Sequence, residues 1–185
     1  MSRRLVILDR DGVINRDSRE FIKSPDEWLP IEGSLEAIGM LSAAGFEVAV
    51  ASNQSGVGRK LIDRPVLEAI HRKMRRLARE AGGDIGRIVF CPHHPDDACD
   101  CRKPAPGLLL ALSRQYGVPL LGVPIIGDSL RDIDAALAVG GRPVLVLTGN
   151  GREAARQLAE RGQAIETYAD LRAAAAALVH EVEGG

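Results

Sequence analysis

The chain is poor in aromatic residues, in net charge and in long hydrophobic runs. Aromatic side chains make up 3% of its 185 residues, and the formal net charge at pH 7 is -1. Proteins that bind nucleic acids stack bases on aromatic rings and neutralise phosphates with basic residues, so this composition argues against a nucleic-acid partner. No apolar run approaches the ~20 residues of a membrane span, and the apolar stretch after Arg3 and Arg4 is too short for a signal peptide. We therefore expect a cytoplasmic protein without a membrane partner.

Cysteine is also scarce. The 3 cysteines cannot all pair with one another, and in a reducing compartment they are better explained as thiols or metal ligands. The remaining composition is ordinary for a globular protein, with 45% hydrophobic and 26% charged residues. The length suffices for one domain with a hydrophobic core, so we expect a single domain over residues 1–185 and a monomer.

Short apolar runs alternate with helical patterns along the chain. The expected strands are residues 5–8, 46–51, 87–90, 123–126 and 143–147, with a shorter one near 164–167. The main helical patterns cover residues 35–44, 65–81, 106–116, 130–139 and the stretch after 170. This alternation predicts an α/β fold of the Rossmann type, a doubly wound, mainly parallel sheet with helices on both faces. No large insertion follows the first or third strand, so we expect no separate cap domain.

Two carboxylates, Asp9 and Asp11, directly follow the first expected strand and precede Gly12. Close carboxylates repel each other unless a cation or a proton separates them, so the pair indicates a functional site. Right-handed crossovers bring the carboxyl ends of the strands to one edge of the sheet, where Ser52 and Asp128 also lie at strand ends. We therefore expect these side chains to converge although they are distant in sequence.

This set of side chains suits phosphoryl transfer. Asp9 can attack phosphorus, and Asp128 can share a Mg2+ ion with it, because hard dications take oxygen ligands. Asp11 can give a proton to the leaving oxygen and take one from the attacking water. Ser52 offers a hydroxyl group and Lys103 a positive charge to the phosphate.

The loop after the third expected strand is dense in metal-ligand residues. Cys91, Cys99 and Cys101 supply three sulfur ligands, and His93 or His94 supplies an imidazole. A set of three cysteines and one histidine is a complete tetrahedral site of the structural kind, so we expect Zn2+ without an open position for a catalytic water. The loop leads directly into two basic residues, which the metal would hold toward the active site.

Four motifs resemble those of the haloacid dehalogenase superfamily of phosphatases. They are Asp9-Arg10-Asp11-Gly12, Ser52-Asn53-Gln54, Lys103 and Gly127-Asp128, in this order along the chain. The longer runs LDRDGVIN, KSPDEW, SNQSGVGR, CPHHPDDACDCRKPAPG and IIGDSLRDI resemble the heptose bisphosphate phosphatases of this superfamily, which act in the synthesis of lipopolysaccharide precursors. The resemblance implies one phosphatase domain with a zinc-binding loop at 91–103, whose histidine ligand is His93.

The resemblance also implies a role for each motif residue. Asp9 forms an aspartyl phosphate, Asp11 acts as acid and base, and Mg2+ is held by both of them, through the backbone carbonyl of Asp11, together with Asp128. Ser52 and Lys103 hold the transferring phosphate. The residues implied in binding a small phosphorylated sugar are Asp17, Ser18, Arg19, Glu20, Ser52, Asn53, Gln54, Ser55, Arg102 and Lys103.

Two other functions stay open on the sequence alone. Histidinol-phosphate phosphatases share the superfamily motifs and a similar cysteine loop, although Ser55-Gly56 and the run KSPDEW favour the sugar phosphatase. A receiver-type signalling domain also places Asp, Ser or Thr, and Lys on a parallel sheet, but it does not need the acid and base that Asp11 provides for turnover. The role of Asp132 is equally open between support of the metal site and an interaction with the helix dipole.

Overall fold

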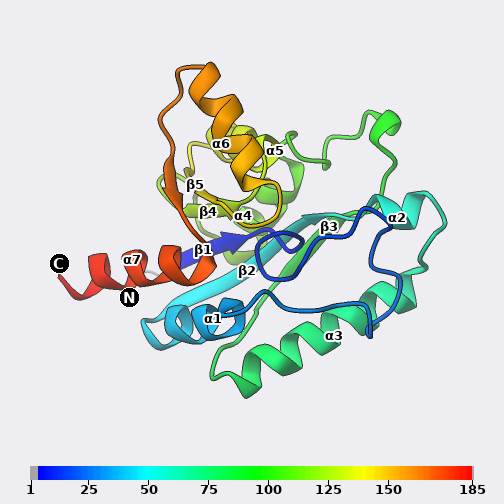
Figure 1. The fold of residues 1–185 in the computed structure, drawn as a ribbon, viewed down its shortest axis with the longest axis horizontal. Helices are drawn as coiled ribbons and strands as arrows, with labels where there is room; N and C mark the ends of the chain where they lie inside the picture. Colours follow the sequence, from blue (N-terminus) through cyan, green and yellow to red (C-terminus); the bar gives the residue numbers. More distant parts are fainter. Residues whose placement is uncertain (1–3, 185) are drawn as a thin grey trace.

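The computed structural model describes residues 4–184, which form a parallel sheet covered by helices on both faces (Figure 1). The strands are β1 (Arg4–Leu8), β2 (Phe46–Asn53), β3 (Ile88–Cys91), β4 (Pro124–Gly127), β5 (Arg142–Val146) and β6 (Glu166–Tyr168). They lie in the order β3-β2-β1-β4-β5-β6, and each neighbouring pair is parallel. The chain winds away from β1 in both directions, which creates a crevice at the carboxyl ends of β1 and β4.

The helices divide between the two faces of the sheet. They are α1 (Ser34–Ala43), α2 (Ser55–Gly58), α3 (Arg64–Glu80), α4 (Gly107–Tyr116), α5 (Leu130–Ala138), α6 (Gly151–Glu160) and α7 (Leu171–Glu183), with a 3-10 helix η1 (Pro95–Asp97). Figure 1 shows α1, α3 and α7 on one side of the sheet and α4, α5 and α6 on the other, and the buried clusters have the same division.

The central strand β1 is buried on both faces. Val6 and Leu8 pack among side chains of α1, α3 and α7, whereas Leu5 and Ile7 pack among those of α4 and α5. A strand that is covered on both sides has no polar face, which explains the uninterrupted apolar run before Asp9. Burial on both faces therefore holds the end of β1, and the carboxylate that follows it, in a defined position.

The predicted fold class is confirmed. The short helices α2 and η1 were not predicted, and the other differences concern the ends of elements. The second strand extends beyond residue 51, because Ser52 and Asn53 continue the parallel pairing with Phe90 and Cys91 of β3. The backbone N–H of Gln54 then donates to the carbonyl of Cys91 at 2.7 Å, so the ladder ends only there. This extension aligns the end of β2 with the start of the cysteine loop.

The long connections lie near the carboxyl edge of the sheet. Residues 9–33 join β1 to α1, and residues 92–106 join β3 to α4 with η1 as a short turn. Neither connection forms a separate cap domain in the part of the chain that the structure describes. No helix between residues 4 and 184 has the length and apolar character needed to cross a membrane.

Candidate active site

A cavity of about 220 Å³ lies where the carboxyl ends of the central strands meet. Asp9 follows β1, and its backbone N–H donates to the carbonyl of Ile126 in β4 at 2.9 Å, which brings it beside Asp128. The predicted site residues that line the cavity are Asp9, Asp11, Asp17, Ser18, Asn53, Gln54, Ser55, Arg102, Lys103 and Asp128. The expected convergence of distant residues is therefore present in the structure.

Three of the residues predicted for catalysis or substrate binding do not line this cavity. Ser52 is 1% exposed, and its hydroxyl oxygen accepts a hydrogen bond from Nε2 of Gln54 at 2.8 Å. Arg19 lines a neighbouring hollow that also includes Asp17, and Glu20 is exposed to solvent. The segment at residues 17–20 therefore contributes two of its four side chains to the cavity wall.

Lys103 is a buried cation between two carboxylates. Its Nζ lies 3.0 Å from Oδ1 of Asp9 and 2.6 Å from Oδ1 of Asp132, and it donates to the carbonyl of Ala51 at 2.7 Å. Burial by itself would lower the pKa of Lys103, but the neighbouring carboxylates outweigh that effect and raise the pKa above its usual value. Lys103 therefore stays charged while it is 4% exposed.

The structure shows the role of Asp132, which its sequence position left open, through the contacts of its two side-chain oxygens. One oxygen pairs with Lys103, and the other accepts hydrogen bonds from the backbone N–H and the hydroxyl of Ser129, at 3.1 and 2.6 Å. The second pair of contacts caps the start of α5, so Asp132 supports both the helix end and the lysine. It acts on the site through Lys103.

Three carboxylates crowd the floor of the cavity. Asp9, Asp128 and Asp132 each offer an oxygen atom within 4.8 Å of the others. Burial raises the pKa of Asp9 well above its usual value, against the attraction of Lys103, and the negative charges of Asp132 and Asp128 add to the rise. Burial likewise raises the pKa of Asp128 to about 7, although the backbone N–H of Asn150 opposes the shift. Such crowded acids suit a hard dication bound by oxygen ligands.

Two glycines enclose the side chain of Asp128. A Cβ atom at Gly12 would lie 2.0 Å from Oδ2 of Asp128, and one at Gly149 would lie 2.1 Å from the same oxygen. Both glycines have a positive backbone φ angle, 83° for Gly12 and 55° for Gly149, and residues that carry a side chain rarely adopt such angles. The turns after β1 and β5 can therefore approach Asp128 only where no side chain intervenes.

Asp11 is held by donors on both of its oxygens. Nε of Arg10 donates to Oδ1 at 2.9 Å and Nη2 to Oδ2 at 3.1 Å. Nδ2 of Asn15 also donates to Oδ1 at 2.9 Å, and Nε2 of Gln54 donates to Oδ2 at 2.8 Å. Behind this group, burial and the nearby charge of Arg10 lower the pKa of His71 to about 3, so its ring is neutral. The Asp11 side chain is still 21% exposed toward the cavity.

Asn53 connects the end of β2 to the loop that carries the lysine. Its Nδ2 donates to the carbonyl of Lys103, and its Oδ1 accepts from the backbone N–H of Lys103, both at 3.0 Å. This paired contact holds the backbone at Lys103 beside the sheet. The side-chain amide of Asn53 therefore positions Lys103. Asn53 also lines the cavity, so the part of its side chain that faces the cavity is still available to a substrate.

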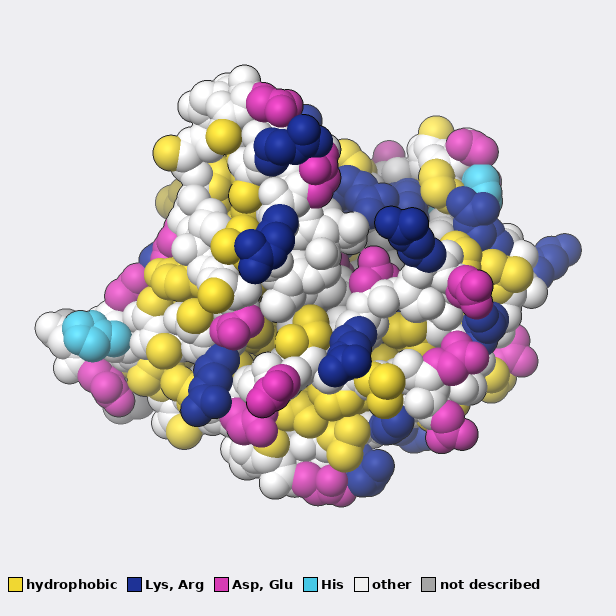
Figure 2. Space-filling view, in the orientation of Figure 1, with side chains coloured by type: hydrophobic (Ala, Val, Ile, Leu, Met, Phe, Trp, Pro, Cys, Tyr) yellow, Lys and Arg dark blue, Asp and Glu magenta, His cyan; other side chains and the backbone are white. Residues whose placement is uncertain are grey.

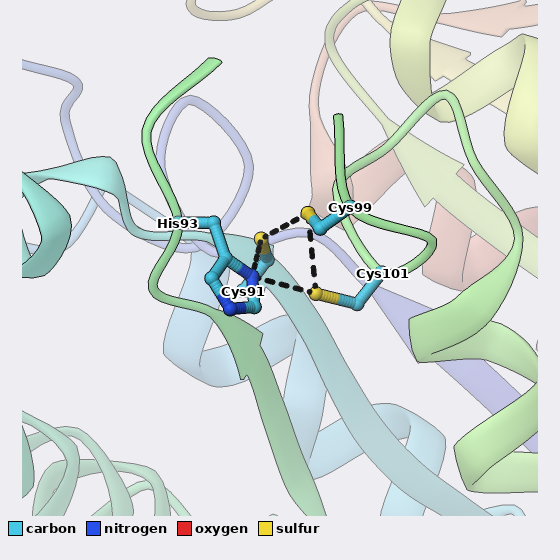
Figure 3. Close-up of side chains that lie close together, drawn as sticks. All are labelled: Cys91, His93, Cys99 and Cys101. Carbon is cyan, nitrogen blue, oxygen red and sulfur yellow. Dashed lines mark hydrogen bonds between the residues drawn. The ribbon is translucent and has the colours of Figure 1, made fainter. Parts of the chain in front are cut away.

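The predicted zinc ligands form a compact group (Figure 3). Sγ of Cys99 lies 3.6 Å from Sγ of Cys91 and from Sγ of Cys101, and Nδ1 of His93 lies 3.2 Å from Sγ of Cys101. Zn–S bonds of about 2.3 Å at tetrahedral angles separate the sulfur atoms by about 3.8 Å, whereas a disulfide would hold them about 2.0 Å apart. The four side chains therefore fit one tetrahedral zinc ion.

The rival ligand His94 has another function in the structure. Its Nδ1 accepts a hydrogen bond from the backbone N–H of Asp96 at 3.3 Å, while its own backbone N–H donates to Asp97 at 2.8 Å. These contacts cap η1. His94 thus shapes the loop, and His93 alone joins the cysteine group.

The cavity wall also carries positive charge. Arg102 and Arg131 both line it, and Nη1 of Arg102 is buried without a hydrogen-bond partner among residues 4–184. Burial lowers the pKa of Arg102, and the positive charge of Arg131 adds to this effect. Figure 2 shows dark blue side chains beside the hollow on this face, with an acidic side chain inside it. The mouth of the cavity is thus suited to an anion.

The sequence did not reveal several residues that shape the site, among them Arg131 in the cavity wall. Arg10 and Asn15 hold Asp11, and Asn150 donates its backbone N–H to Oδ2 of Asp128 at 2.8 Å. Asn150 could have been found by the signal that identified the others, since it follows the carboxyl end of β5. Arg10 carried no such signal, because a basic residue between two acids is equally typical of a surface turn.

Comparison with known proteins extends over nearly the whole chain. A family model described as HAD-hydrolase-like matches residues 100–174, and one described as polynucleotide kinase 3 phosphatase matches residues 5–127. The D-glycero-beta-D-manno-heptose-1,7-bisphosphate 7-phosphatase of Pseudomonas aeruginosa is 54% identical over 179 residues, covering 97% of this chain and 99% of that protein.

Two solved structures of heptose bisphosphate phosphatases are also similar to this chain. The D,D-heptose 1,7-bisphosphate phosphatase of B. bronchiseptica, complexed with magnesium and phosphate, is 50% identical with a TM-score of 0.91 over 96% of this chain and 99% of that one. The D,D-heptose 1,7-bisphosphate phosphatase of Burkholderia thailandensis is 41% identical with a TM-score of 0.74, again over 96% and 99% of the two chains.

These similarities and the carboxylate site lead to one family. The match covers the phosphate-site motifs and the cysteine loop together, and it favours an enzyme over a receiver domain. The chain is a phosphatase of the haloacid dehalogenase superfamily and belongs to the D-glycero-beta-D-manno-heptose-1,7-bisphosphate 7-phosphatase family.

Proposed function

We propose that this phosphatase removes the 7-phosphate of D-glycero-D-manno-heptose 1,7-bisphosphate in a Mg2+-dependent reaction. The observation that carries the proposal is the group of Asp9, Asp128 and Lys103 at the carboxyl edge of the sheet, in a chain similar over almost its full length to enzymes of that name. The enzyme would act as a cytoplasmic monomer in the synthesis of lipopolysaccharide precursors.

Asp9, Asp128 and the backbone carbonyl of Asp11 are the proposed Mg2+ ligands. The raised pKa values of Asp9 and Asp128 support this assignment, because burial and the neighbouring carboxylates disfavour their charged forms and a bound dication would compensate that charge. Asp132 is not included, because Lys103 and Ser129 already occupy its two oxygens. When bound, Mg2+ would neutralise charge on the transferring phosphate.

The protein's own residues would carry the reaction in two steps. In the first, an oxygen of Asp9 attacks phosphorus, the bond to the sugar oxygen breaks, and Asp11 gives that oxygen a proton. In the second, Asp11 takes a proton from a water molecule that attacks the aspartyl phosphate, which releases phosphate and restores Asp9. Lys103 stabilises negative charge at both steps from its place 3.0 Å from Asp9. Ser52 is proposed to donate its hydroxyl proton to the phosphate, although its side chain is buried beside Gln54 and does not line the cavity.

Zinc at Cys91, His93, Cys99 and Cys101 is proposed as a structural ion. All four ligand positions come from the protein, so none is left for water. Cys101 is followed at once by Arg102 and Lys103, and a fixed loop would present both cations to the substrate without further ordering on binding.

The nucleophile can be tested by the change Asp9→Asn. The amide cannot form an acyl phosphate, so we expect kcat to fall by about 10³-fold or more. Mass spectrometry of enzyme quenched during turnover should detect a phosphoryl group on Asp9 of the unaltered protein and none in the variant. Asp84→Asn, at an exposed carboxylate, is the control. Retained activity in Asp9→Asn would rule out this nucleophile.

The metal-free protein should show a pH-dependent effect of Asp128→Asn. The pKa of Asp128 is about 7 in the folded protein and near 3.8 when unfolded, so its favourable contribution is complete below about pH 4 and is lost as pH rises through 7. At pH 8 the free energy of unfolding of Asp128→Asn should therefore exceed that of the unaltered protein by on the order of 2–4 kcal/mol, and its unfolding temperature should be higher. At pH 4 the two proteins should unfold at the same temperature.

Mg2+ provides the counter-test for Asp128. Saturating Mg2+ at pH 8 should reverse the order, because only the unaltered protein gains binding free energy from the ion. Asp96→Asn, at an exposed carboxylate, should leave both measurements unchanged. Equal unfolding temperatures of the two proteins at pH 8 without Mg2+ would contradict the proposed crowding of charge.

Arg102 is expected to recognise the second phosphate of the substrate. Arg102→Gln should lower kcat/KM for the bisphosphate by about 10- to 100-fold, because a charge-assisted hydrogen bond to phosphate is lost. The loss for the 7-monophosphate should be much smaller. Arg64→Gln, at an arginine that lies over the ring of Phe90, is the matched control. Equal losses for the two substrates would refute this role of Arg102.

Removal of zinc should disturb the site through the loop. Cys99→Ser should lose the ion, measured by atomic absorption, and lower the unfolding temperature. Its kcat/KM should fall by about 10- to 100-fold, since both neighbouring cations lose their positions. His94→Ala should keep the ion, because His94 caps η1 instead of joining the cysteines. A Cys99→Ser protein with normal zinc content would contradict the ligand set.

A further inference from the structure

Gln54 occupies the centre of a buried hydrogen-bond network. Its Oε1 accepts from Nη2 of Arg10 at 3.1 Å, and its Nε2 lies 2.8 Å from both Oδ2 of Asp11 and Oγ of Ser52. Gln54 is 6% exposed, although it forms part of the cavity wall. One amide group therefore contacts both a proposed proton donor and a proposed phosphate ligand.

The direction of these hydrogen bonds follows from Arg10. A guanidinium group can only donate, so the atom of Gln54 that faces it must be the carbonyl oxygen. The amide nitrogen is then turned toward Asp11 and Ser52, and its two N–H groups donate to one acceptor each. The amide orientation is thus assigned from the donor and acceptor chemistry of its neighbours, because the oxygen and nitrogen of an amide are otherwise hard to distinguish.

Arg10 is itself firmly held. It is 1% exposed, its Nε and Nη2 contact Asp11, and its Nη1 lies 3.5 Å from Nε2 of His71. That ring nitrogen must be the acceptor, since Arg10 has only donors. With partners on three sides, Arg10 has no room to release Gln54, so the orientation of the amide is built into the folded protein.

These contacts leave Gln54 without a donor for a substrate. Both of its N–H groups are used within the protein, so a direct substrate contact through them would break an existing bond. Asp11, in contrast, keeps 21% of its side chain exposed, and the three residues that hold it leave that part facing the cavity. The network thus fixes Asp11 while its open side meets the substrate.

We propose that Gln54, oriented by Arg10, is a positioning residue that aims the carboxyl group of Asp11 at the leaving oxygen of the phosphate ester. The inference rests on the proposed proton transfer by Asp11. When the P–O bond breaks, its electron pair stays on the leaving oxygen, and a sugar alkoxide needs the proton of Asp11 at that moment. A p-nitrophenolate ion is stable without one. Poor positioning of Asp11 must therefore slow the hydrolysis of sugar phosphates more than that of p-nitrophenyl phosphate.

The test compares two substrates in the Mg2+-loaded, full-length enzyme. Gln54→Met removes the donor to Asp11 with little change in size. We expect kcat/KM for the heptose bisphosphate to fall by about 10- to 100-fold, and that for p-nitrophenyl phosphate by less than about threefold. A residue that merely supports the fold, or that binds the phosphate group, would affect both substrates alike. Equal losses would therefore overturn the inference.

Two further variants keep the outcome clear. Gln163→Met, at an exposed glutamine before the amino end of β6, should change neither rate. If Gln54→Met does not fold, as judged by its thermal unfolding, Gln54→Glu keeps the shape and as a carboxylate has no hydrogen to donate to Asp11, so the same selective loss is expected at a pH where the introduced carboxyl group is ionised.

Asp11→Asn separates this inference from the proposed function. Its kcat/KM, which reports the steps up to transfer of the phosphoryl group to Asp9, should also fall less for p-nitrophenyl phosphate than for the heptose bisphosphate. If it does so and Gln54→Met does not, the acid role of Asp11 stands and the positioning role of Gln54 is wrong. If Asp11→Asn lowers kcat/KM equally for both substrates, the proposed acid role fails, and the inference about Gln54 fails with it.

Discussion

The buried ion pairs of Lys103 are the interaction on which the rest of the site depends. The ammonium group stands between Asp9 and Asp132, away from water, and also donates to a backbone carbonyl of β2. Removing one partner from such a pair leaves an uncompensated buried charge, which typically costs about 3–5 kcal/mol. The same contacts that keep the fold intact around Lys103 thus place a permanent positive charge beside Asp9. Stability and electrostatic preorganisation have one physical origin here.

The loop that carries Lys103 is constrained from several directions. Asn53 binds its backbone at Lys103, and a Cβ atom at Gly107 would lie 2.3 Å from the carbonyl of Asp100, so the loop closes tightly on the start of α4. Before Lys103, the cysteine group brings the two ends of residues 91–101 together. A long loop can therefore position a cation as well as a strand does, because it is attached at both ends and in the middle.

The sequence predicted those parts of the site that depend on local pattern. Strand-end spacing identified Asp9 and Asp128, and ligand spacing identified the cysteine group, because each signal lies within a few neighbouring residues. The fold class followed from the alternation of apolar runs. The clamp formed by Asn53, the network around Arg10 and the contact of Asp132 with Lys103 were not predicted. Each depends on side-chain direction and on the path of a loop, which pattern alone does not contain.

The position of β1 between β2 and β4 has a consequence for the order in which the site forms during synthesis. Asp9 is made more than a hundred residues before β4 and Asp128, and Asn150 follows later still. The nascent chain can pair β1 with β2 early, while the carboxylates stay far apart and hydrated. Their mutual repulsion arises only when β4 docks, by which time Lys103 has already emerged. The chain therefore supplies the compensating cation before the second acid.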